Sequence, residues 1–396
     1  MSKPLEGVRV ADFTMHAAGP FCAHVLSLLG AEVIKVESAM RLDIFRRPHP
    51  VYGRMDVSPF EQVAANKLSV TLNLKEPRAV ELAKRLVAIS DLAIESFRPG
   101  VMERLGLGYE ELSRVKPEIV MLSISAFGQT GLDRSYPGYA PLFGAAGGLG
   151  YLTGYSDGPP VEIRHVMDHS VGMTGAFAAL AALLRRRYDG RGQHVDLAAC
   201  EVASALIGDA LVAAAFGEEP ARCGNASETM APHNVYPCRG TDAWLSIAVS
   251  NEAEWRALAS VMGRTELAAD PRFRTCEDRL KNVAVLDEIV AAWTSSRDAD
   301  DAARELQALG ISAVPSWNAA QLANDVHLRA RGTIVDLEVD GAPRAVVGSL
   351  VRFSKSSCGL RSGTPALGEH NDYVFGDLLG ISRDKRRLLE RERVIY

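Results

Sequence analysis

The sequence predicts an α/β protein built around a doubly wound parallel sheet, and two observations support this fold class. Over residues 8–125, short apolar runs alternate with longer segments of helical periodicity, which is the pattern of successive βαβ units. Hydrophobic residues make up 47% of the 396 residues and charged residues 23%, so the chain can bury a sizeable core. This composition excludes a disordered chain, a collagen-like chain and a small disulfide-stabilised protein.

The N-terminal elements follow one another in a regular order. A strand is expected over 8–13, and the helix expected over 20–29 has Pro20 in its first turn and Gly30 at its end. A second strand is expected over 31–36. The same alternation continues with a helix over 77–89, a strand over 92–95, a helix over 109–115 and a strand over 118–125.

The rest of the chain indicates a long helix and a second domain. A loop rich in glycine and proline is expected over 144–160, followed by an alanine-rich helix over 169–186, a strand over 193–197 and another helix. The composition changes over 217–240, where the second domain is expected to begin. From there we expect a strand over 244–249, helices over 252–263, 280–295 and 302–309, and a hairpin over 334–353 that turns at Asp340-Gly341.

Charge, hydropathy and cysteine spacing limit the classes of partner. The 44 Lys and Arg residues against 49 Asp and Glu give a net charge of −5, so no overall basic surface favours nucleic acid. The most apolar stretch, 171–184, is too short to span a bilayer. The six cysteines contain no CxxC pair, which favours free thiols over disulfides or a metal site. With no apolar signal region at the N-terminus, we expect a cytoplasmic protein without a membrane partner.

Two motifs match known sites only in part. Glu37 follows the first βαβ unit as an acidic residue does in dinucleotide-binding domains, but the turn over 17–22 has one glycine and a proline without an amide hydrogen. NAD binding is therefore disfavoured.

Residues 154–158 match the G-x-S-x-G of α/β-hydrolases, yet Pro159 and Pro160 follow and cannot open an ordinary helix that presents the serine. We interpret this segment as a turn.

Asp168 immediately precedes the helix expected over 169–186, and two interpretations of it remain open. As an N-cap, its carboxylate accepts hydrogen bonds from the first backbone amides of the helix. As a functional group, a carboxylate at the positive end of a helix stays ionised, and in a cleft it can act as a nucleophile. The two roles are compatible, because a cap can face an active site.

Several blocks of residues, in order along nearly the whole chain, resemble those of family III CoA-transferases, the group that includes formyl-CoA, carnitine and bile-acid CoA-transferases. Any one block is weak, and the ordered set is specific. The blocks are 3–8, 18–20, 29–37, 66–67, 69–75, 95–100, 104–106, 127–131, 190–193 and 367–370.

The resemblance implies a reaction centred on Asp168. In this family the aspartate attacks the donor acyl-CoA and gives an aspartyl mixed anhydride and free CoA thiolate, which returns to form an aspartyl-CoA thioester. An acceptor carboxylate then attacks, and CoA leaves on the new acid. CoA thioester is therefore a substrate, no cofactor is permanently bound, and the partners are acyl-CoA and small carboxylic acids.

Position in the family's motifs also implies a CoA cleft. It comprises His16, Ala17, Leu72, Lys75, Phe97, Arg98, Arg104 and Tyr139. Formyl-CoA transferases have Gln at the position of Ala17 and a glycine-rich flap at 224–228, so formyl-CoA and oxalate are disfavoured. A family cation is missing at Ser38, and Arg41 or Arg46 is the candidate replacement.

Two alternative functions remain. An α-methylacyl-CoA racemase or epimerase needs a histidine that would fall at Tyr139, and tyrosine is a poor base near neutral pH. A non-catalytic CoA-binding protein would not need Asp168. For the acid, Arg164, His165 and His169 could hold a second carboxylate, as in succinate, whereas Phe45, Phe143 and Tyr151 could line an apolar pocket for an aromatic or alicyclic acid.

The resemblance further implies the domain organisation. A large Rossmann-like domain is expected from both chain ends, 1–216 and 331–396, with a linker and a smaller α+β middle domain over 217–330. Two such chains are expected to interlock as a homodimer.

Overall fold

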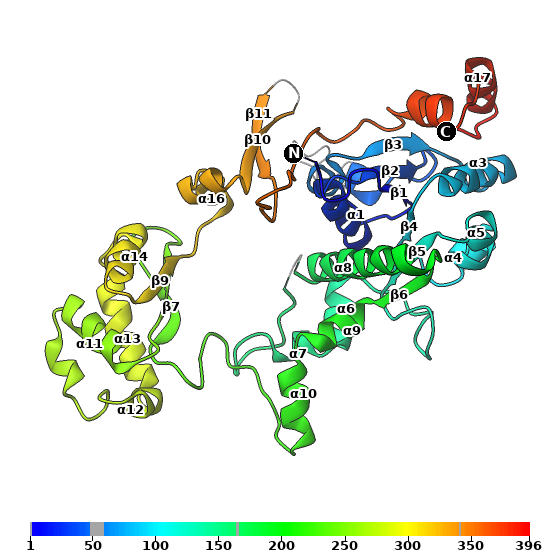
Figure 1. The fold of residues 1–396 in the computed structure, drawn as a ribbon. Coiled ribbons are helices and arrows are strands. Elements are labelled where there is room, and N and C mark those ends of the chain that lie inside the picture. The colour runs from blue at the N-terminus through cyan, green and yellow to red at the C-terminus, as the bar shows by residue number, and fades with distance from the viewer. Residues whose placement is uncertain (1, 48–58, 164–165, 340–341) are drawn as a thin grey trace. The chain divides into compact units, whose positions relative to one another are not determined.

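A six-stranded parallel sheet is the central element of the computed structural model, which describes residues 2–47, 59–163, 166–339 and 342–396 (Figure 1). The strand order is β3-β2-β1-β4-β5-β6, and each neighbouring pair is parallel. The predicted α/β fold is thus confirmed. The strands are β1 (Arg9–Asp12), β2 (Glu32–Glu37), β3 (Leu68–Thr71), β4 (Leu92–Glu95), β5 (Val120–Ser125) and β6 (His194–Ala198).

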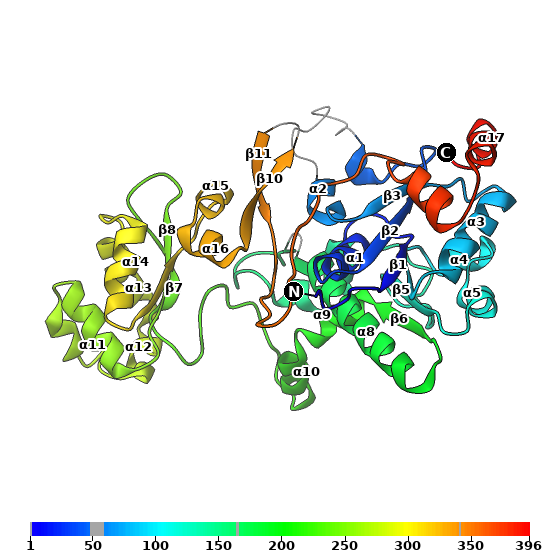
Figure 2. The same cartoon turned by 45° about the horizontal axis from the view of Figure 1, so that its top comes forward.

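Two hydrophobic cores cover the two faces of this sheet, because successive strand residues point to opposite faces. Val10 and Leu122 belong to the core shared with α1, α8 and α9, whereas Ala11 and Met121 belong to the core shared with α3, α5 and α17. Figure 2 shows the sheet between these groups of helices. The helices that contribute residues to these two cores are α1 (Ala18–Leu28), α2 (Pro59–Ala64), α3 (Pro77–Ala88), α4 (Val101–Arg104), α5 (Tyr109–Val115), α6 (Ala140–Ala146), α8 (Val166–Asp189), α9 (Ala199–Ala205), η3 (Asp372–Leu378) and α17 (Arg383–Arg391).

Helices α1 and α8 pack closely enough to require glycine at their contact. A Cβ at Gly172 would lie 2.8 Å from the carbonyl oxygen of Ala18 and 3.1 Å from the amide nitrogen of Cys22, both backbone atoms of α1. A side chain at this position would therefore push the helices apart. This contact sets the start of α8 against the loop that joins β1 to α1.

The last part of the chain returns to the sheet. The N–H of His370 donates to the carbonyl of Ser69 (2.9 Å), and the N–H of Asn73 donates to the carbonyl of Val394 (3.0 Å). An antiparallel hairpin of β10 (Ile334–Val339) and β11 (Ala342–Val347) precedes this return, as the sequence predicts, while its turn at 340–341 lies outside the described residues. Outside the middle of the chain, the remaining elements are η1 (Ile44–Arg46), α7 (Leu149–Leu152), α10 (Gly208–Ala215) and α16 (Val326–Arg331).

The chain forms two compact units. The first comprises Met1–Tyr151, Glu162–Pro220 and Val326–Tyr396, and the second comprises Leu152–Val161 and Ala221–Asp325. Residues 152–161 therefore belong with the middle of the chain, although the sequence placed them in the first domain. The N–H of Gly224 donates to the carbonyl of Gly154 (2.8 Å), which accounts for this assignment.

The second unit has its own antiparallel sheet, in the order β7-β8-β9, and its own core around Trp255 and Phe273. Its elements are β7 (His233–Pro237), β8 (Trp244–Ala248), β9 (Ser312–Pro315), α11 (Glu252–Val261), η2 (Thr265–Ala268), α12 (Cys276–Lys281), α13 (Val283–Thr294), α14 (Ala299–Ala308) and α15 (Ala319–Ala323).

Candidate active site

A cavity of about 380 Å³ lies in the first unit at the carboxyl ends of β1, β4, β5 and β6. The strand order reverses between β1 and β4, which is the switch point where doubly wound sheets bind ligands. The cavity walls come from the loops after these strands, the segment leading into α6, and the first turns of α8 and α9. A small organic ligand fits a cavity of this size.

Six of the nine candidate site residues line this cavity. They are His16, Ala17, Phe97, Arg98, Tyr139 and Asp168. His16 and Ala17 follow β1, Phe97 and Arg98 follow β4, Tyr139 precedes α6 and Asp168 lies in the first turn of α8, so the sheet topology brings together residues that are far apart in the sequence.

The other three candidates lie outside the cavity lining. Leu72 is buried in the core on one face of the sheet, and its N–H donates to the carbonyl of Glu37 (2.8 Å). Lys75 precedes α3 and Arg104 ends α4, and both are exposed.

Asp168 is the third residue of α8, which begins at Val166, so it is not the helix cap that the sequence suggested. The capping interpretation placed the helix start later than it is. The positive end of the helix still stabilises an ionised carboxylate in the first turn. Asp168 is half-buried, and Val171, one turn later on the same helix face, lines the same cavity.

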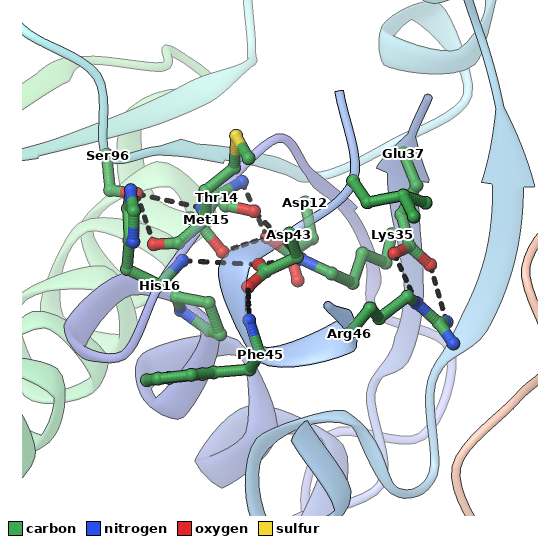
Figure 3. A network of polar contacts seen from close by, with 12 residues as sticks. Asp12, Thr14, Met15, His16, Lys35, Glu37, Asp43, Phe45, Arg46 and Ser96 are labelled. Carbon is green, nitrogen blue, oxygen red and sulfur yellow. Dashed lines mark hydrogen bonds and ion pairs between the residues drawn. The ribbon is translucent and has the colours of Figure 1, made fainter. Parts of the chain in front are cut away.

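Polar contacts hold the loop after β1 in an unusual conformation (Figure 3). His16 has φ of 68°, in the left-handed region that non-glycine residues rarely adopt. Its N–H donates to the Asp43 carboxylate (3.2 Å), and the N–H of Met15 donates to the Ser96 hydroxyl (3.0 Å). These bonds connect the loop to the segments after β2 and β4 and set the His16 ring edge-on to Tyr139, with centroids 5.9 Å apart.

Burial lowers the pKa of His16 below its usual value, although the carboxylates of Asp43 and Asp168 act in the opposite direction. The imidazole is therefore neutral near neutral pH. A neutral ring beside Asp168 can donate or accept one hydrogen bond without pairing as a cation with that carboxylate.

Buried charged side chains also stabilise the loop after β1. Asp12, at the end of β1, pairs with Lys67 at 2.8 Å, and both side chains are fully buried. Lys67 also donates to the carbonyl of Pro20 (2.9 Å), while Lys35 donates to the carbonyl of Thr14 (2.8 Å). Burial opposes ionisation of Asp12, but the cations of Lys67 and Lys35 hold its pKa below the ordinary value. Burial lowers the pKa of Lys67 below its ordinary value, while the Asp12 carboxylate acts in the opposite direction.

The two candidate replacements for the missing cation lie in different environments. Arg46 pairs with Glu37 through two bonds of 2.7 and 2.8 Å and stacks on Phe60, so its guanidinium is fully engaged in the fold (Figure 3). Arg41 lines the cavity. Arg134 also lines it, and no sequence pattern identified this residue.

The residues proposed for the acid are only partly near the cavity. Phe143 lines it, whereas Phe45 and Tyr151 do not. His169 packs against Phe21 of α1, with ring centroids 4.2 Å apart. Arg164 and His165 lie outside the described residues. Within the described ranges, no cluster of three or more His, Cys, Asp or Glu residues could hold a metal ion.

Comparison with known proteins identifies the chemistry. Residues 5–371 match the family model of CoA-transferase family III. The chain belongs to this family. As a family III CoA-transferase it transfers CoA between an acyl-CoA and a carboxylic acid, which confirms the transferase prediction over the racemase and the non-catalytic alternatives.

Relatives of this CoA-transferase align over nearly its full length. It is 37% identical to succinyl-CoA–D-citramalate CoA-transferase of Chloroflexus aurantiacus, over 99% of this chain and 98% of that protein. It is 31% identical to succinyl-CoA:glutarate CoA-transferase of Mus musculus, over 95% and 87% of the two chains. A solved CAIB/BAIF family protein from Brucella suis superposes with a TM-score of 0.87 at 33% identity, over 96% of this chain and all of that one (100%).

Proposed function

We propose that CoA transfer proceeds through covalent intermediates on Asp168. The observation that supports this role is the position of its carboxylate, which lies in the switch-point cavity together with His16, Phe97 and Tyr139. A carboxylate is suited to the task because it has an acidity close to that of the substrate acids, so each exchange is nearly thermoneutral.

The proposed reaction has two symmetrical halves. An Asp168 oxygen attacks the donor thioester carbon, which gives a mixed anhydride and CoA thiolate. The thiolate attacks the Asp168 carbonyl carbon, so that the donor acid leaves with the bridging oxygen and an aspartyl-CoA thioester remains. The acceptor carboxylate attacks this thioester and expels CoA thiolate, and the thiolate then attacks the acceptor carbonyl. The new acyl-CoA is released, and Asp168 regains its second oxygen.

Positive charge around the cavity supports a role in binding anions. Arg41, Arg98 and Arg134 all line it, and guanidinium groups bind phosphate and carboxylate in a bidentate manner. We assign Arg41 to the role of the cation that Ser38 lacks. Lys75 and Arg104 are exposed beyond the cavity, where they can contact the phosphates of a long CoA chain, while Leu72 shapes the core beneath.

We propose succinyl-CoA as donor and a second dicarboxylic acid as acceptor. Three relatives are named for succinyl-CoA with D-citramalate, L-malate or glutarate. One arginine of the cavity can bind the carboxylate that does not react, and a charged hydrogen bond of this kind contributes about 1.5–3 kcal/mol.

The acid specificity can be measured with initial rates of transfer from succinyl-CoA to a panel of acids. We expect kcat/KM for glutarate, malate or citramalate to exceed that for butyrate by about tenfold or more, because butyrate lacks the second carboxylate. Equal or faster transfer to monocarboxylic acids would contradict the assignment. In that case the arginines that line the cavity would bind CoA and not a second carboxylate of the acid.

Exposed apolar side chains on α8 and around α10 support a homodimer. Phe177 and Leu184 of α8 and Val212 of α10 are exposed, and Phe216, just after α10, is 84% exposed. No residue of α10 is buried. Exposed apolar side chains that gather into a large patch mark protein–protein interfaces. We propose that a second copy of the chain covers these side chains and that the two chains interlock.

Native mass spectrometry tests both parts of the dimer proposal. We expect a dimer at micromolar concentration, and Phe216→Asp should shift it toward monomer, because a buried unpaired charge is costly. When unlabelled and ¹⁵N-labelled dimers are mixed, interlocked chains should form no mixed dimer without unfolding. Rapid formation of mixed dimers would exclude the interlock, and a monomer would exclude the dimer.

We propose a cytoplasmic location, although α8 is long and apolar enough by composition to cross a membrane. Its buried residues, such as Val171 and Ala179, pack in the core with α1 and β5, which supports a role as a core helix.

A further inference from the structure

Ser125 differs from the other buried serines of the described chain. It ends β5, lines the same cavity as Asp168 and is only 9% exposed, yet its hydroxyl has no hydrogen-bond partner among the described residues. The hydroxyls of the four other buried serines each bond to a protein group. These are Ser27 to the His24 carbonyl, Ser69 to Glu37, Ser90 to the Leu86 carbonyl and Ser123 to His194, at 2.7–2.9 Å.

A buried hydroxyl without a partner destabilises the fold by about 1–3 kcal/mol. Alanine at this position would avoid the cost, because it has no hydroxyl to satisfy. Ser125 lines the cavity, and its hydroxyl can adopt other staggered rotamers about a single bond. A ligand bound in the cavity can supply the partner that the described residues do not.

We infer that the Ser125 hydroxyl donates a hydrogen bond to an oxygen of the transferred acyl group, either the thioester carbonyl or the carboxylate. The inference rests on the proposed function, in which this group reacts at Asp168. Ser125 and Asp168 line the same cavity, as does Val171, one turn after Asp168 on α8. Oxygen at the reacting carbon gains negative charge at each step, and a fixed donor stabilises it.

The test is to compare Ser125→Ala with wild type in both activity and stability. We expect kcat/KM to fall by about 100- to 1000-fold, the range for removal of one donor to a developing oxyanion. The midpoint of thermal unfolding should stay unchanged or rise, since an unsatisfied buried hydroxyl is removed. A purely structural serine would give the opposite pair of results, a lower midpoint with unchanged kcat/KM, and that outcome would overturn the inference.

Ser27→Ala and Ser90→Ala are matched controls, because both hydroxyls are buried and bonded outside the cavity. Both variants should have a lower midpoint of thermal unfolding and keep the wild-type kcat/KM.

A covalent CoA adduct on wild-type protein separately tests the proposed function. If wild type forms the adduct and Ser125→Ala reacts as fast, the role of Ser125 is excluded while that of Asp168 stands. If wild type forms none, the covalent mechanism fails, and an unchanged kcat/KM in Ser125→Ala would still decide against the serine.

Discussion

Replacing Asp168 with asparagine is expected to lower kcat for CoA transfer by roughly 10³-fold or more. The amide has nearly the shape of the carboxylate but cannot form the mixed anhydride, so the covalent route is closed while the fold is kept. The measurement is the initial rate of transfer from succinyl-CoA to a dicarboxylic acid, with circular dichroism to verify folding.

Asp384→Asn is the matched control for this variant. Asp384 also lies in the first turn of a helix, α17, but outside the cavity lining. Its substitution should leave kcat within about twofold of wild type, since surface changes of this kind have small effects. Asp168→Asn with more than about a tenth of wild-type kcat would show that another group or a direct transfer carries the reaction.

Lys67→Met is expected to produce the largest loss of stability. The substitution removes the cation that pairs directly with the fully buried Asp12 carboxylate and leaves only the more distant Lys35 to offset its charge, and removal of one partner of a buried ion pair costs about 3–5 kcal/mol. The midpoint of thermal unfolding should fall by about 4–6 °C. Differential scanning calorimetry measures this change directly.

Two comparisons isolate the buried charge as the cause. The double variant Asp12→Asn with Lys67→Met should recover much of the loss, because no ion is then left unpaired. Lys84→Met, which breaks an ion pair with the exposed Glu81, should change stability by less than about 1 kcal/mol. If the midpoint of thermal unfolding of Lys67→Met lies within about 2 °C of wild type, this would contradict the claim that the buried pair stabilises the loop that carries His16.

Elements with strong local periodicity could be predicted from the sequence, and those determined by tertiary packing could not. The expected ranges 92–95 and 109–115 coincide with β4 and α5, and the Gly30 position after α1 indeed has positive φ. The expected loop over 144–160 instead contains the end of α6 and all of α7. Glycine there indicated a loop, but a Cβ at Gly147 would lie 2.6 Å from the Cys200 carbonyl, so glycine permits close contact between α6 and α9.

The candidate site could be predicted where residues fall in recognisable blocks. Phe97 lies in such a block, His16 and Asp168 were assigned by their position relative to the blocks, and all three line the cavity. Ser125 and Arg134 lie at or beyond the end of β5 and carry no local signal, because their place in the cavity depends on how strands far apart in sequence are ordered in the sheet. The state of the Ser125 hydroxyl is likewise visible only in three dimensions.

Intact-protein mass spectrometry after brief mixing with succinyl-CoA tests the central claim most directly. We expect wild type to gain the mass of one CoA thioester, hydroxylamine to convert the adduct to a hydroxamate at Asp168, and Asp168→Asn to show neither change. An unmodified protein during rapid turnover, or a hydroxamate at another residue, would contradict covalent transfer through Asp168.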